Sequence, residues 1–372
     1  MADPFAWIDD ELAEWARPGL TRTLNIVDRQ WINFASNDYL GLAADPRLAQ
    51  AAGASTCGFG AGASPLVSGW TEAHHALAQA LARFEGTESV VLFPSGYAAN
   101  LGTIGALVGQ GDAVYLDRLN HASLIDGAKL SGATLRVYPH NGADKLDHIL
   151  ERDQGRFRRR LIATDGVFSM DGDLAPLDLL AQVAENHEAM LIVDEAHGTG
   201  VYGPQGRGAA SAFGLAKHVH VTVGTLSKAL GTLGGFVAGP KRVCDWLIQR
   251  ARPLIYSTSL PIPVVAAARC ALEIITQEPW RRERIFAASR LLHARLGIEP
   301  HPFFGPIVPV ILGESDRAMA IATRLRSAGF LVPAIRPPTV PEGTARLRIS
   351  ITASHTDEQI EGLATALKSY LE

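Results

Sequence analysis

The chain has 372 residues, 47% of them hydrophobic and 19% charged, with a formal net charge of −4. Beyond about 250–300 residues one hydrophobic core rarely keeps growing, so two domains are expected, and the composition excludes a disordered chain. The slightly acidic balance gives no reason to expect nucleic acid as a partner. The three cysteines, Cys57, Cys244 and Cys270, are too few and too widely spaced for a disulfide framework or a zinc site. A reducing cytoplasm fits them best, and neither a signal peptide nor a membrane-spanning run is recognisable.

The first 35 residues have no core of their own, and we expect them to pack on another domain or on a partner subunit. A large α/β domain is predicted over 36–255, where short apolar runs alternate with helix-like stretches from about residue 75 to residue 240. The segment Ser257–Pro263, rich in proline and hydroxyl groups, marks the boundary to a smaller α+β domain over 256–372.

The alternation predicts a mainly parallel sheet with helices on both faces. Its predicted helices include Ala76–Phe84 and Leu177–Asn186. The predicted strands are Ser89–Leu92, Ala113–Leu116, Leu135–Tyr138, Leu161–Thr164, Met190–Val193 and Val219–Val223.

Polar side chains follow several of these strands, at the edge where open α/β sheets bind their ligands. Gly96 and Tyr97 follow the first strand and open a helix, so their backbone amides are candidates to bind a phosphate. Tyr97 could equally be an ordinary core residue. His121 follows the next strand; its imidazole could stack on a flat cofactor ring or be a purely structural histidine.

The strongest signal is the pair of segments Asp194–Gly200 and Thr225–Gly231, each directly after an apolar run. Lys228 lies among small residues in a mostly apolar stretch, which favours the nucleophilic amine that forms a Schiff base with an aldehyde. Asp194 could hold a pyridinium nitrogen protonated, and His197 could bond the cofactor's phenolic oxygen. Thr225 is placed to donate to phosphate. Singly, these residues could be a surface lysine and turn-capping Asp and His side chains, but together they predict a pyridoxal-phosphate site.

Two further motifs carry less weight. Gly58–Ala63 matches the glycine pattern of dinucleotide-binding loops, but no strand precedes it and no helical periodicity follows, so a backbone-rich loop is expected. The pairs His74–His75 and His218–x–His220 lack acidic partners at metal-binding spacing. No metal is predicted.

These segments resemble the α-oxoamine synthases, a branch of the fold-type I pyridoxal-phosphate enzymes, over most of the chain from about Asn33 to His355. The markers of the resemblance are Ser36–Leu42, Leu66–Gly69, Asp165–Gly172, Asp194–Gly200, Ser227–Lys228 and Tyr256–Pro261.

The resemblance implies an aspartate-aminotransferase-like fold and a homodimer with its site at the interface. It implies that Lys228 bonds covalently to pyridoxal phosphate, Asp194 pairs with the pyridine nitrogen and His121 stacks on the ring. Ser169 and His197 would contact the ring's oxygen substituent. Gly96, Tyr97 and Thr225 would lie near the cofactor, chiefly at its phosphate.

For the substrates, the resemblance implies that Arg348 holds the amino-acid carboxylate, for which a guanidinium is suited by its two parallel hydrogen bonds. Thr339 matches a residue associated with the product or the acyl substrate, and Asn37 and Arg336 lie in matching segments. The N-terminal arginine that contacts substrate is Arg22 or Arg17. Pro65 and Trp70 depart from the family pattern, which leaves the acyl-binding end the least defined.

Within the family, Ile335–Pro341 looks most like the biotin-synthesis branch. That branch condenses L-alanine with a pimeloyl thioester and releases 8-amino-7-oxononanoate, carbon dioxide and free thiol. The identity of the thioester carrier, coenzyme A or acyl carrier protein, stays open. The choice between alanine, glycine and serine also stays open, because one methyl group changes pocket affinity by only about 1–3 kcal/mol. The same scaffold could also carry an aminotransferase or a catalytically silent binding protein.

Overall fold

The computed structural model describes residues 3–16, 21–55, 58–299 and 304–371. These residues form two compact units, one of residues 38–169 and 173–284, the other of residues 1–37, 170–172 and 285–372. Helix α12 (Trp280–Leu296) contains the change from one unit to the other. The sequence places a boundary near residue 256 instead. The larger unit extends beyond residue 256, as far as residue 284. It does so because α11 (Ile262–Gln277) packs against α2 (Pro46–Gly53) and α3 (Glu72–Glu85).

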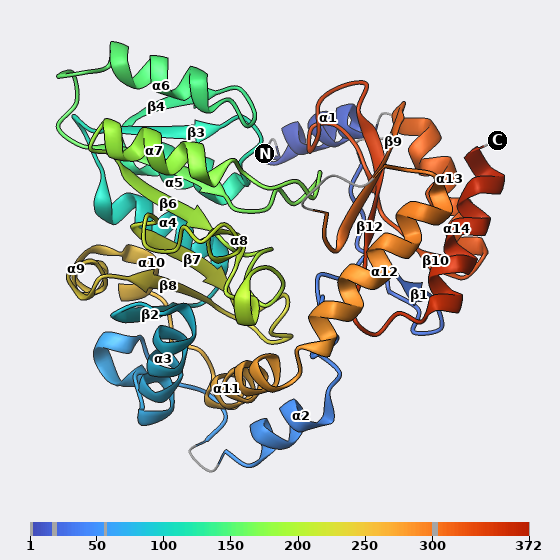
Figure 1. Cartoon of the computed structure of the whole chain (residues 1–372), viewed down its shortest axis with the longest axis horizontal. Helices are drawn as coiled ribbons and strands as arrows, with labels where there is room; N and C mark the ends of the chain where they lie inside the picture. The colour runs from blue at the N-terminus through green and yellow to red at the C-terminus, as the bar shows by residue number, and fades with distance from the viewer. Residues whose placement is uncertain (1–2, 17–20, 56–57, 300–303, 372) are drawn as a thin grey trace. The chain divides into compact units, whose positions relative to one another are not determined.

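The larger unit is built on a seven-stranded sheet with the order β2-β8-β7-β6-β5-β3-β4. All neighbouring pairs are parallel except those of β8, which runs antiparallel to β2 and to β7 (Figure 1). This confirms the predicted α/β fold with a mainly parallel sheet. The strands are β2 (Ser89–Phe93), β3 (Ala113–Asp117), β4 (Thr134–Tyr138), β5 (Arg160–Asp165), β6 (Met190–Asp194), β7 (Val221–Thr225) and β8 (Gly235–Gly239).

Each predicted strand forms, with bounds within two residues of those expected, but β8 is missing from the prediction. Its sequence, Gly235-Phe-Val-Ala-Gly239, is short and has a glycine at each end, which weakens a strand signal. The glycine is needed at position 235, because a Cβ there would lie 2.4 Å from the backbone oxygen of Ser95. Packing against other parts of the fold, rather than the local sequence, therefore determines that this strand forms.

Helices lie on both faces of the sheet (Figure 1), as parallel strands buried on both sides require. Helix α4 (Gly96–Leu107) packs on β7 and β8 and against α5 (Ala122–Ser131) and α9 (Lys241–Arg250), around a core that includes Phe93, Ile104 and Val223. Helix α3 packs on β2 and β8, and α7 (Leu177–Asn186) packs on β6. Shorter or peripheral elements are η1 (Pro65–Gly69), α6 (Ala143–Arg152), η2 (Pro204–Gly206), α8 (Ala209–Ala212) and α10 (Arg252–Ile255).

The smaller unit contains an antiparallel sheet of β9 (Ile307–Gly313), β12 (Ala345–Ser350) and β11 (Ala334–Ile335). Helices α13 (Ser315–Ser327) and α14 (Asp357–Leu371) pack together, and their apolar side chains join those of β9 and β12 in one core. Strand β1 (Ile32–Asn33) pairs in parallel with β10 (Phe330–Leu331), which ties the N-terminal part of the chain to its last hundred residues.

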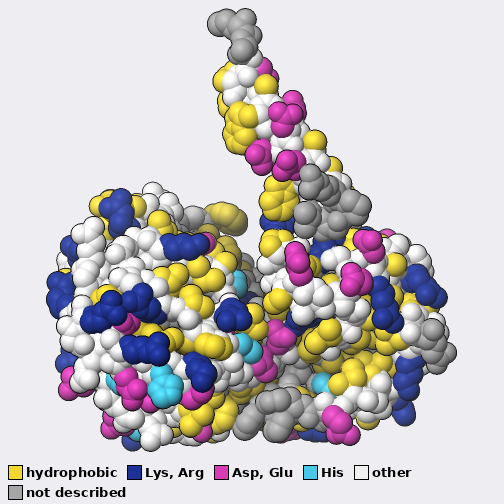
Figure 2. Space-filling view, turned by 90° about the horizontal axis from the view of Figure 1, so that it is seen from above, with side chains coloured by type: hydrophobic (Ala, Val, Ile, Leu, Met, Phe, Trp, Pro, Cys, Tyr) yellow, Lys and Arg dark blue, Asp and Glu magenta, His cyan; other side chains and the backbone are white. Residues whose placement is uncertain are grey.

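The N-terminal helix α1 (Ala6–Trp15) differs from the rest because none of its described side chains is buried. Trp7 and Leu12 are more than half exposed, and hydrophobic side chains are visible along this segment in Figure 2. The expectation that residues 1–35 pack on another surface stays a prediction. Within the described ranges, no helix combines the length and the apolar character needed to cross a membrane.

Candidate active site

The carboxyl ends of β2, β3, β5, β6 and β7 meet at one edge of the sheet, and most of the predicted cofactor residues follow these strand ends. Asp194 is the last residue of β6 and Thr225 the last of β7. Gly96 opens α4 just after β2, and His121 precedes α5 just after β3. The larger unit therefore assembles these residues from segments far apart in the chain.

Asp194 is 5% exposed and is held by two donors. Its Oδ2 accepts from Nδ2 of Asn100 at 2.5 Å, and its Oδ1 accepts from the backbone amide of Ala196 at 2.8 Å. A buried carboxylate is costly unless it is hydrogen-bonded or paired with a cation. A protonated ring nitrogen would supply the cation.

Asn100 also links Asp194 to His121. Its Nδ2 donates to Oγ of Ser123 at 2.9 Å, and that hydroxyl lies 2.7 Å from Nδ1 of His121. Because Nδ1 also accepts from the backbone amide of Ser123 at 3.3 Å, the imidazole proton belongs on Nε2. This chain of hydrogen bonds fixes the His121 ring relative to the carboxylate. Neither Asn100 nor Ser123 is among the residues that the sequence predicts for the site.

His121 keeps part of its surface exposed, which leaves room for a flat ligand to stack on it. Partial burial lowers the pKa of His121; the charge of Asp194 opposes this, and the charge of Lys228 lowers the pKa further. The imidazole is therefore neutral near pH 7. The electrostatic effect of Lys228 on His121 also places the lysine in the same neighbourhood as the histidine.

A second carboxyl group, Asp165, lies beside Asp194 across β5 and β6 and is 3% exposed. Its Oδ2 accepts from the backbone amide of His121 at 2.8 Å. Burial and the charge of Asp194 raise the pKa of Asp165 well above its usual range. The neighbouring aspartates thus have different partners: Asp194 is held by Asn100 and the amide of Ala196, and Asp165 anchors the His121 backbone. In the sequence, Asp165 stands out only as the start of a family motif.

His197 is 5% exposed, and its Nδ1 lies 2.6 Å from the hydroxyl of Tyr39. Tyr39 is fully buried and belongs to the Ser36–Leu42 segment. The tyrosine therefore orients the imidazole predicted to contact the ring's oxygen substituent. Ser169, the second residue predicted for that contact, is half-buried in the loop after β5.

The start of α4 and the end of β7 form a cradle without bulky side chains. Ser95 caps α4 by accepting from the amide of Ala98 at 3.1 Å. A Cβ at Gly96 would lie 3.4 Å from Cβ of Thr225, so these two chain segments are in close contact. The first amides of a helix have no intrahelical acceptor and attract anions. Tyr97 is exposed and its hydroxyl donates to Asp126, so Tyr97 is not a core residue.

Lys228 is held in a tight turn after β7. The amide of Gly231 donates to the Lys228 carbonyl at 2.8 Å, and Gly231 has a φ of +65°. A Cβ at Gly231 would lie 2.4 Å from the amide of Ala43, so only glycine fits there. Oγ1 of Thr225 donates to the carbonyl of Gly234 at 2.9 Å and accepts from the amide of Ser227 at 3.1 Å. These bonds give the lysine a fixed backbone from which to extend.

The predicted substrate residues lie in the smaller unit. Arg348 on β12 is 5% exposed, and its Nη1 donates to Asn37 Oδ1 at 3.1 Å and to Ser350 Oγ at 2.9 Å. Arg346, two residues earlier, is ion-paired with Asp171. The structure thus brings Arg348 and Asn37 together and gives the neighbouring arginine a different partner.

Arg336 Nη2 donates to the carbonyl of Thr21 at 3.0 Å, next to Arg22. The Arg22 guanidinium lies 6.0 Å from the centre of the Trp15 ring. Thr339 is exposed, and its amide donates to the carbonyl of Arg336 at 3.1 Å. Arg17, the alternative to Arg22, lies outside the described residues.

His140 holds the loop that carries Ser169. Its Nδ1 lies 3.0 Å from Asp117 Oδ1, its Nε2 lies 2.9 Å from Asp173 Oδ2, and its ring packs edge-on against Phe168. Burial lowers the pKa of His140, but the bonds and charges of the two aspartates outweigh it and raise the pKa to about 10. His140 is therefore an imidazolium that joins the end of β3 to this loop.

The raised pKa predicts a pH-dependent stability. His140 stabilises the fold fully below the unfolded pKa of 6.5, and this contribution is lost as the pH rises toward about 10. A His140→Asn variant should be less stable than the original chain by roughly 2–4 kcal/mol at pH 6, allowing for solvent screening, and by much less at pH 9.5. Urea unfolding at both pH values measures the difference. The control is His148→Asn, at an exposed residue that pairs with Glu151. If the stability lost in His140→Asn is the same at pH 6 and pH 9.5, the prediction is contradicted.

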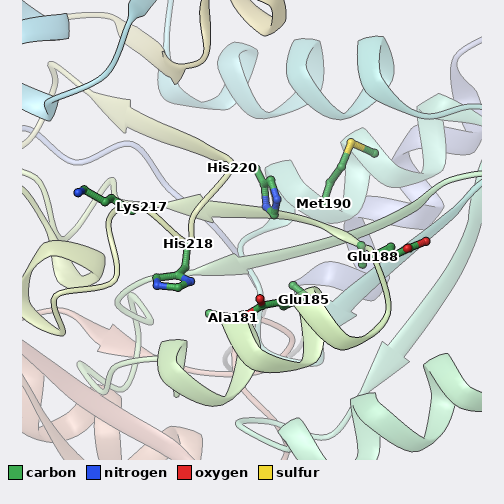
Figure 3. Close-up of a pocket in the computed structure, with 9 residues that line it drawn as sticks. Ala181, Glu185, Glu188, Met190, Lys217, His218 and His220 are labelled. Carbon is green, nitrogen blue, oxygen red and sulfur yellow. The ribbon is translucent and has the colours of Figure 1, made fainter.

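The weaker sequence motifs lie elsewhere. Gly58–Ala63 forms a loop without helix, and His74 is buried with Nε2 at 2.8 Å from the carbonyl of Leu260. His218 and His220 line a pocket of about 420 Å³ at the amino ends of β6 and β7, the opposite edge of the sheet (Figure 3). Among the described residues, the cluster with metal-ligand spacing is Asp147, His148 and Glu151, which is largely exposed.

Comparison with known proteins places the chain in a family. Residues 29–367 match the aminotransferase class I and II family. This chain belongs to that family. Curated 8-amino-7-oxononanoate synthases are similar over nearly the whole length: that of Anaeromyxobacter dehalogenans (strain 2CP-1) is 48% identical over 98% of this chain and 95% of its own. That of Methylococcus capsulatus is 52% identical over 90% of this chain and 88% of its own.

Solved structures of α-oxoamine synthases share the fold. A Sphingomonas wittichii serine palmitoyltransferase has a TM-score of 0.92 and 33% identity, covering 99% of this chain and 98% of its own. The Francisella tularensis 8-amino-7-oxononanoate synthase has a TM-score of 0.80 and 31% identity, covering 92% and 98%. These matches confirm the resemblance found in the sequence and the fold-type I architecture.

The family binds pyridoxal phosphate, and a structurally similar serine palmitoyltransferase from S. paucimobilis was solved with a PLP–myriocin adduct. The residues present here fit this cofactor. The start of α4, where Gly96 contacts Thr225 and the first helical amides lack intrahelical acceptors, suits a phosphate, and the buried Asp194 carboxylate suits a protonated ring nitrogen. Lys228 would supply the amine for covalent attachment, and His121 would supply a flat surface for the ring.

Proposed function

We propose that this chain is an 8-amino-7-oxononanoate synthase, which condenses L-alanine with a pimeloyl thioester in biotin biosynthesis. The observation that carries the proposal is the identity of 48% and 52% with curated enzymes of that name over at least 90% of the chain. The site geometry supports the same reaction class, since it combines an amine, a charged carboxylate and an anion cradle at one edge of the sheet.

In the proposed reaction, pyridoxal phosphate would supply an electron sink for the bond broken at Cα of the amino acid. Nζ of Lys228 would remove the Cα proton. Cα would then form a bond to the thioester carbonyl carbon, the carbon–sulfur bond would break and the thiol would leave. Loss of the carboxylate as carbon dioxide and return of a proton to Cα would give the product, 8-amino-7-oxononanoate.

The chain's own groups would direct these steps. Asp194, held by hydrogen bonds from Asn100 and the amide of Ala196, would keep the proton on the ring nitrogen. His121, kept neutral and fixed through Ser123, would cover one face of the ring. Arg348 would bind the carboxylate of the amino acid, and we assign Thr339, Arg336, Asn37 and Arg22 to the substrate side on family resemblance.

A thiol-release assay tests the proposal. Alanine, glycine and serine are each combined with acyl thioesters of several lengths, with and without a distal carboxylate, on coenzyme A and on acyl carrier protein. The proposal expects the highest kcat/KM for alanine with the pimeloyl thioester. A preference for glycine, or for an acyl group without the distal carboxylate, would overturn it while leaving the condensation chemistry intact.

A second candidate is a related synthase acting on serine and another acyl thioester, favoured by the TM-score of 0.92 with serine palmitoyltransferase. The same assay separates the two, because that enzyme would prefer serine and a long apolar chain. Exchange of amino groups with a keto acid, without thiol release, would indicate an aminotransferase instead.

Arg348 offers a specific prediction. Arg348→Lys keeps the positive charge but loses the planar, two-pronged donor set that matches a carboxylate. We expect KM for the amino acid to rise by roughly 10- to 100-fold, a loss of about 1.4–2.7 kcal/mol of binding, with KM for the thioester nearly unchanged. Steady-state kinetics with each substrate varied measure this split, and equal rises in both KM values would contradict the assignment.

We also propose a homodimer in which the exposed N-terminal segment packs on the second copy. Trp7 is 63% and Leu12 60% exposed, and burying two such side chains is worth about 1.5–3 kcal/mol each. The double variant Trp7→Ser, Leu12→Ser should raise the dimer dissociation constant at least tenfold in analytical ultracentrifugation. Leu130→Ser, at a residue 75% exposed on α5, is the control. An unchanged dimer in the double variant would exclude this segment from the interface.

The expected partners are small molecules, with an acyl carrier protein as a candidate thioester donor that the assay above examines directly. The expected location is the cytoplasm, where the two described cysteines, Cys244 and Cys270, would remain thiols.

A further inference from the structure

A pair of buried glutamates lies behind the cofactor residues, outside the groups assigned so far. Glu195 follows Asp194 directly and is fully buried; Glu85 ends α3 and is 9% exposed. Their charges interact with each other, and Arg207 is the cation that acts on Glu85. Burial and the like charge of a neighbouring carboxylate both disfavour ionisation of Glu85.

The Glu195 carboxylate is bound by backbone amides on both oxygens. Oε2 accepts from the amide of Ala209 at 2.8 Å, and Oε1 accepts from the amide of Ala210 at 2.8 Å. Its own carbonyl accepts from the amides of Gly198 and Thr199 at 2.8 and 2.7 Å. One residue therefore ties the turn after β6 to the start of α8.

The surrounding backbone is shaped to this carboxylate. A Cβ at Gly198 would lie 1.8 Å from Oε2 of Glu195, and one at Gly208 would lie 2.6 Å from its carboxyl carbon. Gly166, at the end of β5, would place a Cβ 3.0 Å from Oε2. Three glycines from three segments thus approach the same side chain, and at Gly198 and Gly208 a larger residue would force the carboxylate to shift.

The two glutamates differ in which form their surroundings favour. Burial raises the pKa of Glu195 to about 7, although the two amides counteract it. Burial and the charge of Glu195 raise the pKa of Glu85 well above its usual range. Oε1 of Glu85 is buried without a hydrogen-bond partner, which a neutral acid tolerates far better than an anion. The hydrogen bonds therefore favour the ionised form at Glu195 and the neutral form at Glu85.

We propose that Glu195 is a positioning residue for the cofactor: its ionised carboxylate locks the turn 194–200 onto α8 and so orients Asp194 and His197. Glu85 holds a proton beside it and leaves the negative charge on Glu195. The inference rests on the cofactor roles of Asp194 and His197 given above, and it does not depend on which substrates the enzyme uses.

The test compares Glu195→Gln with Glu85→Gln. At position 195, glutamine removes the charge and turns an NH2 group toward one of the two backbone donors. At position 85, glutamine replaces a neutral acid by a neutral amide of the same shape. The apo forms are titrated with pyridoxal phosphate, and the dissociation constant, the visible absorption band and its pH midpoint are recorded with the melting temperature.

We expect Glu195→Gln to weaken cofactor binding at least tenfold and to shift the pH midpoint of the absorption band, while Glu85→Gln stays within twofold of the original chain. Gly166→Ala places a Cβ 3.0 Å from Oε2 of Glu195 without changing any charge, and it should weaken cofactor binding in the same direction, which keeps the test valid if Glu195→Gln does not fold. A lower melting temperature with unchanged cofactor affinity and spectrum would overturn the proposal. These readouts need no substrate, so they are independent of the thiol-release assay.

Discussion

Lys228→Ala is expected to abolish covalent attachment of the cofactor and to lower condensation activity by more than about 10³-fold, since it removes both the nucleophile and the proposed base. The turn that holds Lys228 is formed by backbone bonds of Gly231, Thr225 and Ser227, so the alanine variant should fold normally. Borohydride reduction followed by mass spectrometry measures the attachment directly. The original chain should gain the mass of one reduced cofactor, and the variant should gain none.

The matched control is Lys217→Ala. Lys217 lines the pocket at the amino ends of β6 and β7, at the edge of the sheet opposite to the cofactor residues (Figure 3). This variant should keep both the added mass and the activity. If the Lys228 variant still carried a reduced cofactor, another lysine would have to be the site of attachment.

Asp194→Asn should lower kcat by about 10²–10³-fold, the range seen when one group that stabilises charge at a reacting centre is removed. The substitution keeps the shape of the side chain but removes the negative charge needed opposite a ring nitrogen. Its new NH2 group would also face a donor, either Nδ2 of Asn100 or the amide of Ala196. Cofactor affinity should fall as well, and a spectrophotometric titration with pyridoxal phosphate measures that loss.

Asp165→Asn provides the comparison, since Asp165 pairs with Asp194 across the same two strands. Burial and the charge of Asp194 raise the pKa of Asp165 and so favour its neutral form, which asparagine imitates. The asparagine oxygen can accept the same bond from the amide of His121. We expect this variant to retain cofactor affinity within a few-fold; equal losses in the two variants would show that Asp194 does not have the special role given to it.

The positions of the site residues along the chain could be predicted because apolar strands are easy to recognise and their carboxyl ends meet at one edge. Asp194 and Thr225 end strands, so their neighbourhood follows from the sheet alone. The family resemblance added roles that spacing does not reveal, above all the carboxylate-binding role of Arg348. None of these roles needed side-chain geometry to be proposed.

Several features depend instead on packing between distant segments. Asn100 lies one turn into α4 and bonds to Asp194, 94 positions further along the chain, a relation with no local signature. The raised pKa of Asp165 follows from its burial and from the charge of a neighbour on the next strand. The boundary between the two units falls within α12 because α11 packs on α2 and α3, and amphipathic patterns alone do not predict that packing.

The pairing of Ile32 with Phe330 has a consequence for the newly synthesised protein. Chains are made from the N-terminus, and domains generally fold as units during synthesis. The unit of residues 38–169 and 173–284 can collapse once α11 has left the ribosome. Strand β1 is synthesised before that unit, but its partner β10 is made only when nearly the whole polypeptide has emerged. The β1 segment therefore remains a substrate for chaperones and proteases longer than any part of the sheet that carries Lys228.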